Sequence, residues 1–105
     1  MKNEILYEVT VTVESPNRDG FEDYMTRRHI PDVLATGCFA RASFVTDGAG
    51  KYRTTYLAAG QAALDRYFSD FASGLRDDFT VHFPAGVSVE RQVWHWLKEF
   101  NGNAE

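Results

Sequence analysis

The stretch "ILYEVTVTV", residues 5–13, decides how the rest of the chain is read. Its side chains alternate between two faces. One face is apolar and consists of Ile5, Tyr7, Val9, Val11 and Val13, whereas the other consists of Leu6, Glu8, Thr10 and Thr12. This alternation predicts a β-strand with one buried face.

A helix is predicted after the turn "ESPNRDG", residues 14–20, because large side chains recur at helical spacing from Phe21 to His29. Pro31 lacks a backbone N–H and disfavours helical backbone at the residue before it. We therefore expect one kinked helix or two joined helices, with Pro31 at the first position of a short second one. Gly37 is expected to end that helix.

Two further strands are predicted at residues 39–46 and 51–59, because the turn "DGAG" between them is typical of a β-hairpin. A second long helix is predicted over residues 60–79, where aromatic and aliphatic side chains form a stripe. The last strand is predicted at residues 87–94. "HWLKEF", residues 95–100, is expected to form a short terminal helix.

The element order is then βαββαβ, in an α+β chain whose 105 residues suffice for one domain. Two right-handed crossovers with this order give a four-stranded antiparallel sheet with both helices on one face, which is the ferredoxin-like fold. We expect the first and third strands to be central and parallel to each other.

The sheet face that the helices leave uncovered has a mixed composition. Its expected members are Leu6, Glu8, Thr10, Thr12, Phe39, Arg41, Ser43, Val45, Arg53, Thr55, Leu57, Glu90, Gln92 and Trp94. Apolar groups interleaved with charges are typical of an interface, so we expect a homodimer that packs sheet on sheet. A solvated face with scattered apolar side chains is the alternative.

Four polar residues from separate segments are expected to meet at one end of the layer between sheet and helices. His29 ends the first helix, and Tyr7 and Tyr52 begin the first and third strands. Arg91 alternates in step with Val87, Val89 and Val93, so its side chain is expected on the helix-facing side of the sheet. Its guanidinium then needs an acidic partner, aromatic rings or a polar cavity. Convergent polar groups in an apolar layer predict a pocket for a small organic molecule.

In this pocket His29 is the candidate catalytic acid or base, because the ordinary pKa of histidine lies near neutrality. Tyr7 and Tyr52 would position hydroxyl groups on the substrate, and Arg91 would hold a carboxylate or phenolate. The combination favours a flat, anionic or phenolic ligand. Carbonyl groups at the end of the helix are expected to favour the protonated form of His29.

Each of these residues also has a purely structural interpretation. The tyrosines can pack their rings and expose their hydroxyls at the rim, and His29 can cap carbonyls freed by Pro31. Arg91 can pair with Asp78 or Glu8.

Composition excludes several classes of function. The formal net charge of −4 argues against a nucleic-acid partner, which needs a basic face. A single cysteine, Cys38, excludes an internal disulfide and a cysteine-based metal site. No apolar stretch has the length of a signal peptide or membrane span, so the expected compartment is the cytoplasm. Neither a cofactor motif nor a metal-ligand spacing is present, and haem ligation by a histidine stays open.

Several segments together resemble a family of small bacterial proteins whose domain has no assigned function, within the dimeric α/β-barrel superfamily. They are "ILYEVTVTV", "RRHIPDVLATGCF", "KYRTTYLAA", "YFSDFASGLRDDF" and "ERQVW", and they span Ile5 to about Trp94. The wider superfamily includes cofactor-free monooxygenases, lactone isomerases, haem-degrading enzymes and amino-acid-sensing domains. The resemblance implies a ligand cavity between sheet and helices, and it leaves the activity open.

Two classes of function remain. One is a small enzyme that transforms an anionic or aromatic metabolite by acid–base chemistry at His29. The other is a non-catalytic ligand-binding or structural homodimer. An enclosed void beside His29 favours the first class, and a filled one favours a structural role.

Overall fold

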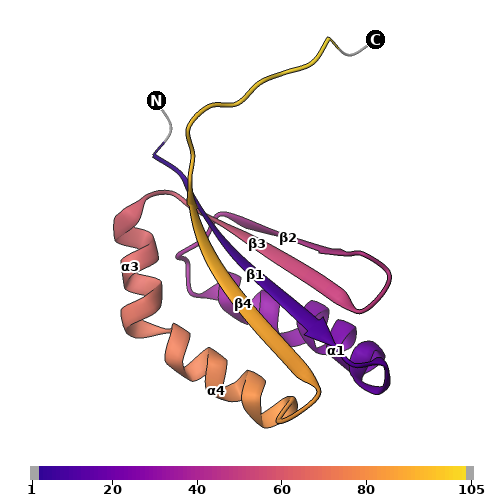
Figure 1. Ribbon diagram of the computed structural model, residues 1–105. Helices are drawn as coiled ribbons and strands as arrows, with labels where there is room; N and C mark the ends of the chain where they lie inside the picture. The colour runs from indigo at the N-terminus through magenta and orange to yellow at the C-terminus, as the bar shows by residue number, and fades with distance from the viewer. Residues whose placement is uncertain (1–2, 104–105) are drawn as a thin grey trace.

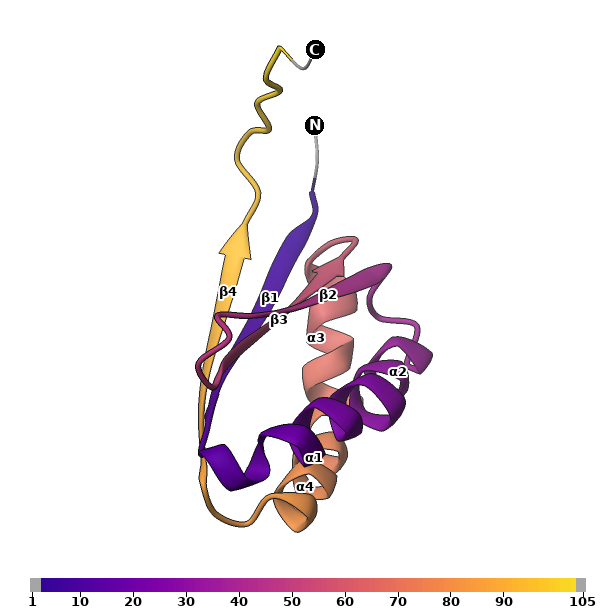
Figure 2. The ribbon, with the colours of Figure 1, turned by 90° about the vertical axis from the view of Figure 1, so that its right-hand side faces the viewer.

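The computed structural model describes residues 3–103, and a four-stranded antiparallel sheet forms one of its two layers (Figure 1). Its strands are β1 (Ile5–Val13), β2 (Arg41–Thr46), β3 (Lys51–Ala58) and β4 (Val87–His95), in the spatial order β2-β3-β1-β4. The helices all lie on one side of the sheet (Figure 2). This is the predicted βαββαβ, ferredoxin-like α+β fold.

The expectation that the first and third strands are parallel is wrong. β1 pairs antiparallel with β3, and β3 pairs antiparallel with β2. The first helical crossover makes β2 parallel to β1, and the hairpin at residues 47–50 then reverses the chain. The start of β3 therefore lies beside the end of β1, as the pairing of Tyr52 with Val11 shows.

The interruption expected near Pro31 takes the form of a π-helical turn, and the chain remains helical through it. Helix α1 (Arg18–Tyr24) follows the short 3₁₀ turn η1 (Ser15–Asn17), and the π turn η2 (Met25–His29) joins it to α2 (Ile30–Ala35). The Ile30 N–H donates to the Met25 carbonyl, five residues back. A π turn changes the direction in which the following side chains point, and His29 is the last residue of this turn.

The helical sequence over residues 60–79 forms two helices rather than the single one expected. Helix α3 (Gln61–Asp70) and helix α4 (Ala72–His82) meet at Phe71, whose φ of −126° is not helical. The break lets the Phe71 ring pack at one end of the core while Phe79 reaches the other end.

The short terminal helix expected at residues 95–100 is absent. β4 continues to His95, and the chain beyond it is extended and leaves the body of the molecule (Figure 1). Leu97 and Phe100 are 95% and 81% exposed. An amphipathic helix is stabilised by packing its apolar face, and these two side chains of the segment have no such packing in the described structure.

The core between sheet and helices divides into two clusters. The first core cluster contains Ile5, Tyr7, Val33, Cys38, Phe39, Tyr56, Ala58, Leu64, Tyr67 and Ala72. The second core cluster contains Val11, Val13, Phe21, Tyr24, Met25, Tyr52 and Phe79. Phe39 was expected on the uncovered face, but it precedes β2, so the strand alternation does not extend to it, and its ring stacks on Tyr7 inside the first cluster.

Candidate functional site: a pocket between sheet and helices

A cavity of about 30 Å³ lies where the two core clusters meet. Its walls come from β1 and β3 on one side, from η2, α3 and α4 on the other, and from the edge strand β4. The lining residues are Tyr7, Val9, Val11, Met25, His29, Tyr56, Tyr67, Arg76, Phe79, Val89 and Arg91. This volume holds about two water molecules, since one water needs about 10–15 Å³ on the same measure.

Three of the four predicted site residues line this cavity: Tyr7, His29 and Arg91. Tyr52 does not. Because β3 runs antiparallel to β1, Tyr52 lies at the far end of the sheet, and its hydroxyl donates a hydrogen bond to Glu22. The tyrosine of β3 that lies opposite Tyr7 is Tyr56, which sequence reasoning missed.

His29 is half-buried, and its Nδ1 atom has no hydrogen-bond partner within residues 3–103. Burial lowers the pKa of His29, and the carboxylates of Asp78 and Asp32 offset this only in part. The expectation that the helix end favours the protonated form is therefore wrong, because desolvation outweighs the nearby negative charge. At neutral pH the pocket contains a neutral imidazole.

Tyr56 has the other buried polar atom without a partner in the described part of the chain, its hydroxyl oxygen. Burial raises the pKa of Tyr56 far above its ordinary value, so this hydroxyl stays protonated and can donate. Burial also raises the pKa of the neighbouring Tyr67 to about 12. The Tyr7 hydroxyl accepts a hydrogen bond from Nη2 of Arg76 at 3.3 Å.

Two exposed guanidinium groups stand at the rim of the pocket, Arg91 on β4 and Arg76 on α4. Arg91 pairs in register with Val9 on the helix-facing side, but β4 is an edge strand, so its side chain reaches solvent and avoids the burial cost expected from the sequence. It forms no hydrogen bond or ion pair with another residue of the described chain. The two suggested partners, Asp78 and Glu8, are engaged by other arginines.

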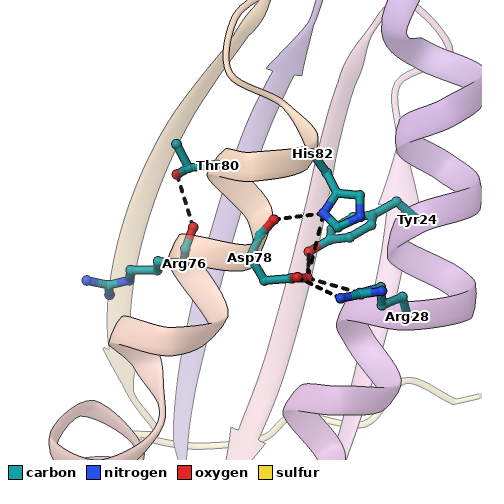
Figure 3. A network of polar contacts seen from close by, with 6 residues as sticks. All are labelled: Tyr24, Arg28, Arg76, Asp78, Thr80 and His82. Atoms are coloured by element: carbon teal, nitrogen blue, oxygen red, sulfur yellow. Dashed lines mark hydrogen bonds and ion pairs between the residues drawn. The ribbon is translucent and has the colours of Figure 1, made fainter.

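Asp78 on α4 instead joins this helix to the segment formed by α1 and η2, and we call this set of contacts the Asp78 clamp (Figure 3). Its carboxylate accepts hydrogen bonds from the Tyr24 hydroxyl at 2.6 Å and from Nε and Nη2 of Arg28 at 3.0 and 2.7 Å. His82 Nδ1–H donates to the Asp78 backbone carbonyl at 2.8 Å. The Arg28 guanidinium and the Tyr24 hydroxyl hold the pKa of Asp78 below its ordinary value, so this contact persists at neutral pH.

The described residues contain no group of three or more histidine, cysteine, aspartate or glutamate side chains arranged to hold a metal ion. Within the same residues, no helix is both long enough and apolar enough to cross a membrane.

The pocket offers a neutral imidazole, protonated phenols and two cations at the rim. These groups can bind an anion at the rim, donate a hydrogen bond inside and accept a proton.

Comparison with known families identifies residues 4–96 as a domain of unknown function, DUF4286. The chain belongs to this family. The match confirms the resemblance seen in the sequence over nearly its whole extent. No curated protein matches the chain.

Several solved structures share the fold. SnoaB, a cofactor-independent oxygenase from Streptomyces nogalater, is 16% identical with a TM-score of 0.75, and the alignment covers 95% of this chain and 99% of SnoaB. The monooxygenase ActVA-Orf6 of Streptomyces coelicolor, in complex with nanaomycin D, is 12% identical with a TM-score of 0.71, covering 94% and 92%. A dimeric ferredoxin-like protein from an uncultured marine organism is 10% identical with a TM-score of 0.62, covering 92% and 98%.

Proposed function

We propose that this protein binds a flat, anionic or phenolic organic molecule in the pocket between sheet and helices. The observation that carries the proposal is the pair of buried polar atoms without partners among residues 3–103, His29 Nδ1 and the Tyr56 hydroxyl. A buried polar group without a hydrogen bond destabilises the fold, so two of them lining one cavity indicate groups that a ligand or water satisfies.

The charge of the ligand follows from the rim. Arg91 has no partner within residues 3–103, and Arg76 makes one hydrogen bond to the Tyr7 hydroxyl at 3.3 Å. Both guanidinium groups can donate to a carboxylate or phenolate. The rings of Tyr7, Tyr56 and Tyr67 supply flat apolar surface below the rim, which suits an aromatic body.

The chemistry of the site follows from the protonation states. A neutral His29 accepts a proton directly, so the bond from the proton to a phenol oxygen or an acidic carbon breaks as the bond to Nδ1 forms. The Tyr56 hydroxyl then donates a hydrogen bond to the oxygen that gains negative charge. The oxygenases SnoaB and ActVA-Orf6 support an enzymatic role by sharing the fold, and the reaction itself is proposed here from the residues alone.

A ligand larger than two waters requires the helical layer to move away from the sheet. The cavity walls on α4 and η2 are joined by the Asp78 clamp, and the break at Phe71 gives α4 a place to pivot. We infer that the ligand enters between α4 and β4, where the two rim arginines lie. The small cavity also favours the alternative function, a structural homodimer in which water occupies the pocket.

We further propose that the protein is a homodimer formed through the uncovered sheet face. Trp94 and Val45 are 51% and 55% exposed on this face, and charged side chains surround them. The dimeric ferredoxin-like protein of the same fold supports this assembly. The cytoplasmic location expected from the sequence stays a prediction.

Titration with 2-naphthoate, a flat aromatic carboxylate, tests the ligand proposal by calorimetry. Its matched control is naphthalene-2-methanol, which has the same rings and no charge. We expect the carboxylate to bind more tightly, and the Arg91→Gln variant to lose this preference without losing stability. If 2-naphthoate, naphthalene-2-methanol and 2-naphthol all fail to bind, the structural alternative is favoured.

A further inference from the structure

Two tyrosines that line the cavity, Tyr7 on β1 and Tyr56 on β3, lie directly opposite each other in the sheet. Their rings are stacked, with centroids 6.0 Å apart and planes 26° apart, and both side chains are buried. Burial raises the pKa of Tyr56, and the neighbouring Tyr67 and Tyr7 add to this effect. Tyr7 and Tyr56 therefore extend side by side from the sheet into the same pocket.

Both hydroxyl groups of this pair have a proton to donate. Within residues 3–103, the Tyr56 hydroxyl has no hydrogen-bond partner. The Tyr7 hydroxyl accepts a hydrogen bond from Nη2 of Arg76 at 3.3 Å, and it donates to no acceptor in the same residues. A phenol hydroxyl that accepts a hydrogen bond keeps its own O–H for another acceptor. Two neighbouring donors without an acceptor fit a single ligand oxygen, which can accept two hydrogen bonds.

Arg76 is held beside Tyr7 by an aromatic ring. Its guanidinium lies over Phe68, 5.9 Å from the ring centroid, and the Phe68 ring packs edge-on against Tyr7 with centroids 5.2 Å apart. A cation that donates to a phenol oxygen makes the phenol a stronger donor, because the cation stabilises negative charge on that oxygen. Arg91, the other rim cation, has no such contact in the described chain, so the two arginines differ in what they can do.

We propose that Tyr7 and Tyr56 bind the oxygen of a phenolate through two hydrogen bonds, with Arg76 as the positioning residue for Tyr7. This inference rests on the proposed function, and it identifies the ligand group that enters the pocket. In the reaction step, the O–H bond of the bound phenol breaks, its proton goes to Nδ1 of His29 and its electron pair stays on the oxygen. The oxygen that gains this charge then accepts the hydrogen bonds of the two tyrosines.

The acidity of the ligand follows from the balance of this proton transfer. An ordinary phenol has a pKa of about 10, whereas burial lowers the pKa of His29 below 6.5, so the transfer is unfavourable by roughly a thousandfold or more. A hydrogen bond to a charged group contributes about tenfold, so two donors offset about a hundredfold. The remainder has to come from the ligand. The site therefore fits a phenol that an electron-withdrawing substituent makes more acidic.

Binding of 4-nitrophenol to the full chain tests this assignment, because the ionised form of this phenol absorbs visible light and the neutral form does not. The control ligand 4-nitroanisole has the same ring and no acidic proton. We expect the protein to prefer the ionised form, so that bound 4-nitrophenol ionises at a lower pH than the free compound. Tyr7→Phe and Tyr56→Phe should each reduce this preference by about tenfold. Tyr52→Phe, whose hydroxyl bonds Glu22 outside the pocket, should leave it unchanged.

Variants of Arg76 separate the positioning role from a general effect of charge. If Arg76 acts through Tyr7, Arg76→Gln should reduce the preference in the parent protein and cause no further loss in Tyr7→Phe. Arg76→Lys, which keeps a cationic donor, should restore part of the preference. Losses that add in the double variant would overturn the positioning role.

The same titrations distinguish failure of this inference from failure of the proposed function. Circular dichroism checks that each variant is folded, and Tyr56→Phe and Arg76→Gln still test the site if Tyr7→Phe does not fold. A parent protein that binds 4-nitrophenol without preferring its ionised form, or a preference that both tyrosine variants retain, would overturn the phenolate site alone. If neither 4-nitrophenol nor 4-nitroanisole binds the parent protein, the proposed ligand pocket itself is contradicted.

Discussion

The two core clusters contain similar aromatic rings, but they differ in whether the tyrosine hydroxyls have hydrogen-bond partners. In the second core cluster, the Tyr52 hydroxyl donates to Glu22 and the Tyr24 hydroxyl donates to Asp78. In the first core cluster, the Tyr56 hydroxyl has no partner in the described chain. Across the pocket, Nδ1 of His29, whose ring contacts Tyr24 and Phe79 of the second cluster, has none either. Each cluster packs tyrosine against phenylalanine with ring centroids about 5–6 Å apart.

This difference distinguishes residues that stabilise the fold from residues that are available to bind a ligand. A phenol paired with a carboxylate is complete, since its donor is satisfied and its ring is packed. A phenol buried without a partner is destabilising unless another molecule supplies one. The comparison therefore assigns stability to the second cluster and ligand binding to the boundary of the first, where the pocket lies.

The largest effect that this comparison predicts is at Phe21, the centre of the second cluster, which is 0% exposed. Phe21→Ala leaves a cavity and removes apolar contacts, so we expect a loss of about 3–5 kcal/mol in the free energy of unfolding. Urea denaturation followed by circular dichroism measures it. Val45→Ala, on the exposed face, is the control and should change stability by less than about 0.5 kcal/mol in the monomer.

A smaller effect is expected at the clamp between the helical segments. Asp78→Asn should lower the melting temperature at pH 7, because the carboxylate that Arg28 and Tyr24 share is lost. The pKa of Asp78 is lowered in the fold, so its stabilisation is present above its ordinary pKa and disappears as pH falls through the lowered value. The two melting temperatures should therefore converge as pH falls below 3.8 and through the lowered pKa of Asp78. A difference that persists there would contradict the ion pair as its cause.

Much of the fold could be predicted from the sequence because local patterns determine it. The alternation of Ile5 to Val13, the turn at residues 47–50 and the stop at Gly37 each act within a few residues. The break at Phe71 and the extended chain after His95 depend on packing that a local pattern does not contain. Helical periodicity continued across both places.

The candidate site was predicted in part. His29, Tyr7 and Arg91 line one pocket, but it lies where the two core clusters meet rather than at one end of the layer, since Arg91 pairs with Val9 in the middle of β1. Tyr52 was wrongly assigned to the pocket because the third strand was expected to run parallel to the first, whereas it runs antiparallel. An antiparallel hairpin places Tyr56 opposite Tyr7, so the correct register alone would have identified it. The missing partners of Tyr56 and His29 are properties of the packed structure.

His29 gives a pH-dependent test of the pocket itself. Its folded pKa lies below its ordinary value of 6.5, so the unfolded chain binds more protons between these two values. Stability should therefore be complete above about pH 6.5 and fall as pH decreases through this window. His29→Gln should remove that part of the decline in a comparison of urea midpoints at pH 7.5 and 5.5. Equal declines in both proteins would contradict a neutral, desolvated His29.

The smallest effect on stability is expected at the rim. Arg91→Gln should change the free energy of unfolding by less than about 0.5 kcal/mol, because the guanidinium is exposed and has no partner in the described chain. Arg28→Gln, which breaks the clamp, serves as the matched control and should destabilise more. A large loss in Arg91→Gln would identify Arg91 as scaffold rather than as a ligand-binding group.

The most direct test compares two variants that each remove one hydroxyl oxygen, Tyr52→Phe and Tyr56→Phe, by urea denaturation and by titration with 2-naphthoate. Tyr52→Phe breaks the hydrogen bond to Glu22, so we expect it to cost about 1 kcal/mol of stability and leave binding unchanged. Tyr56→Phe removes a buried hydroxyl that has no partner in the described part of the chain, so we expect unchanged or increased stability and weaker binding. A destabilised Tyr56→Phe variant that binds 2-naphthoate as well as the parent protein would contradict the division between scaffold and site.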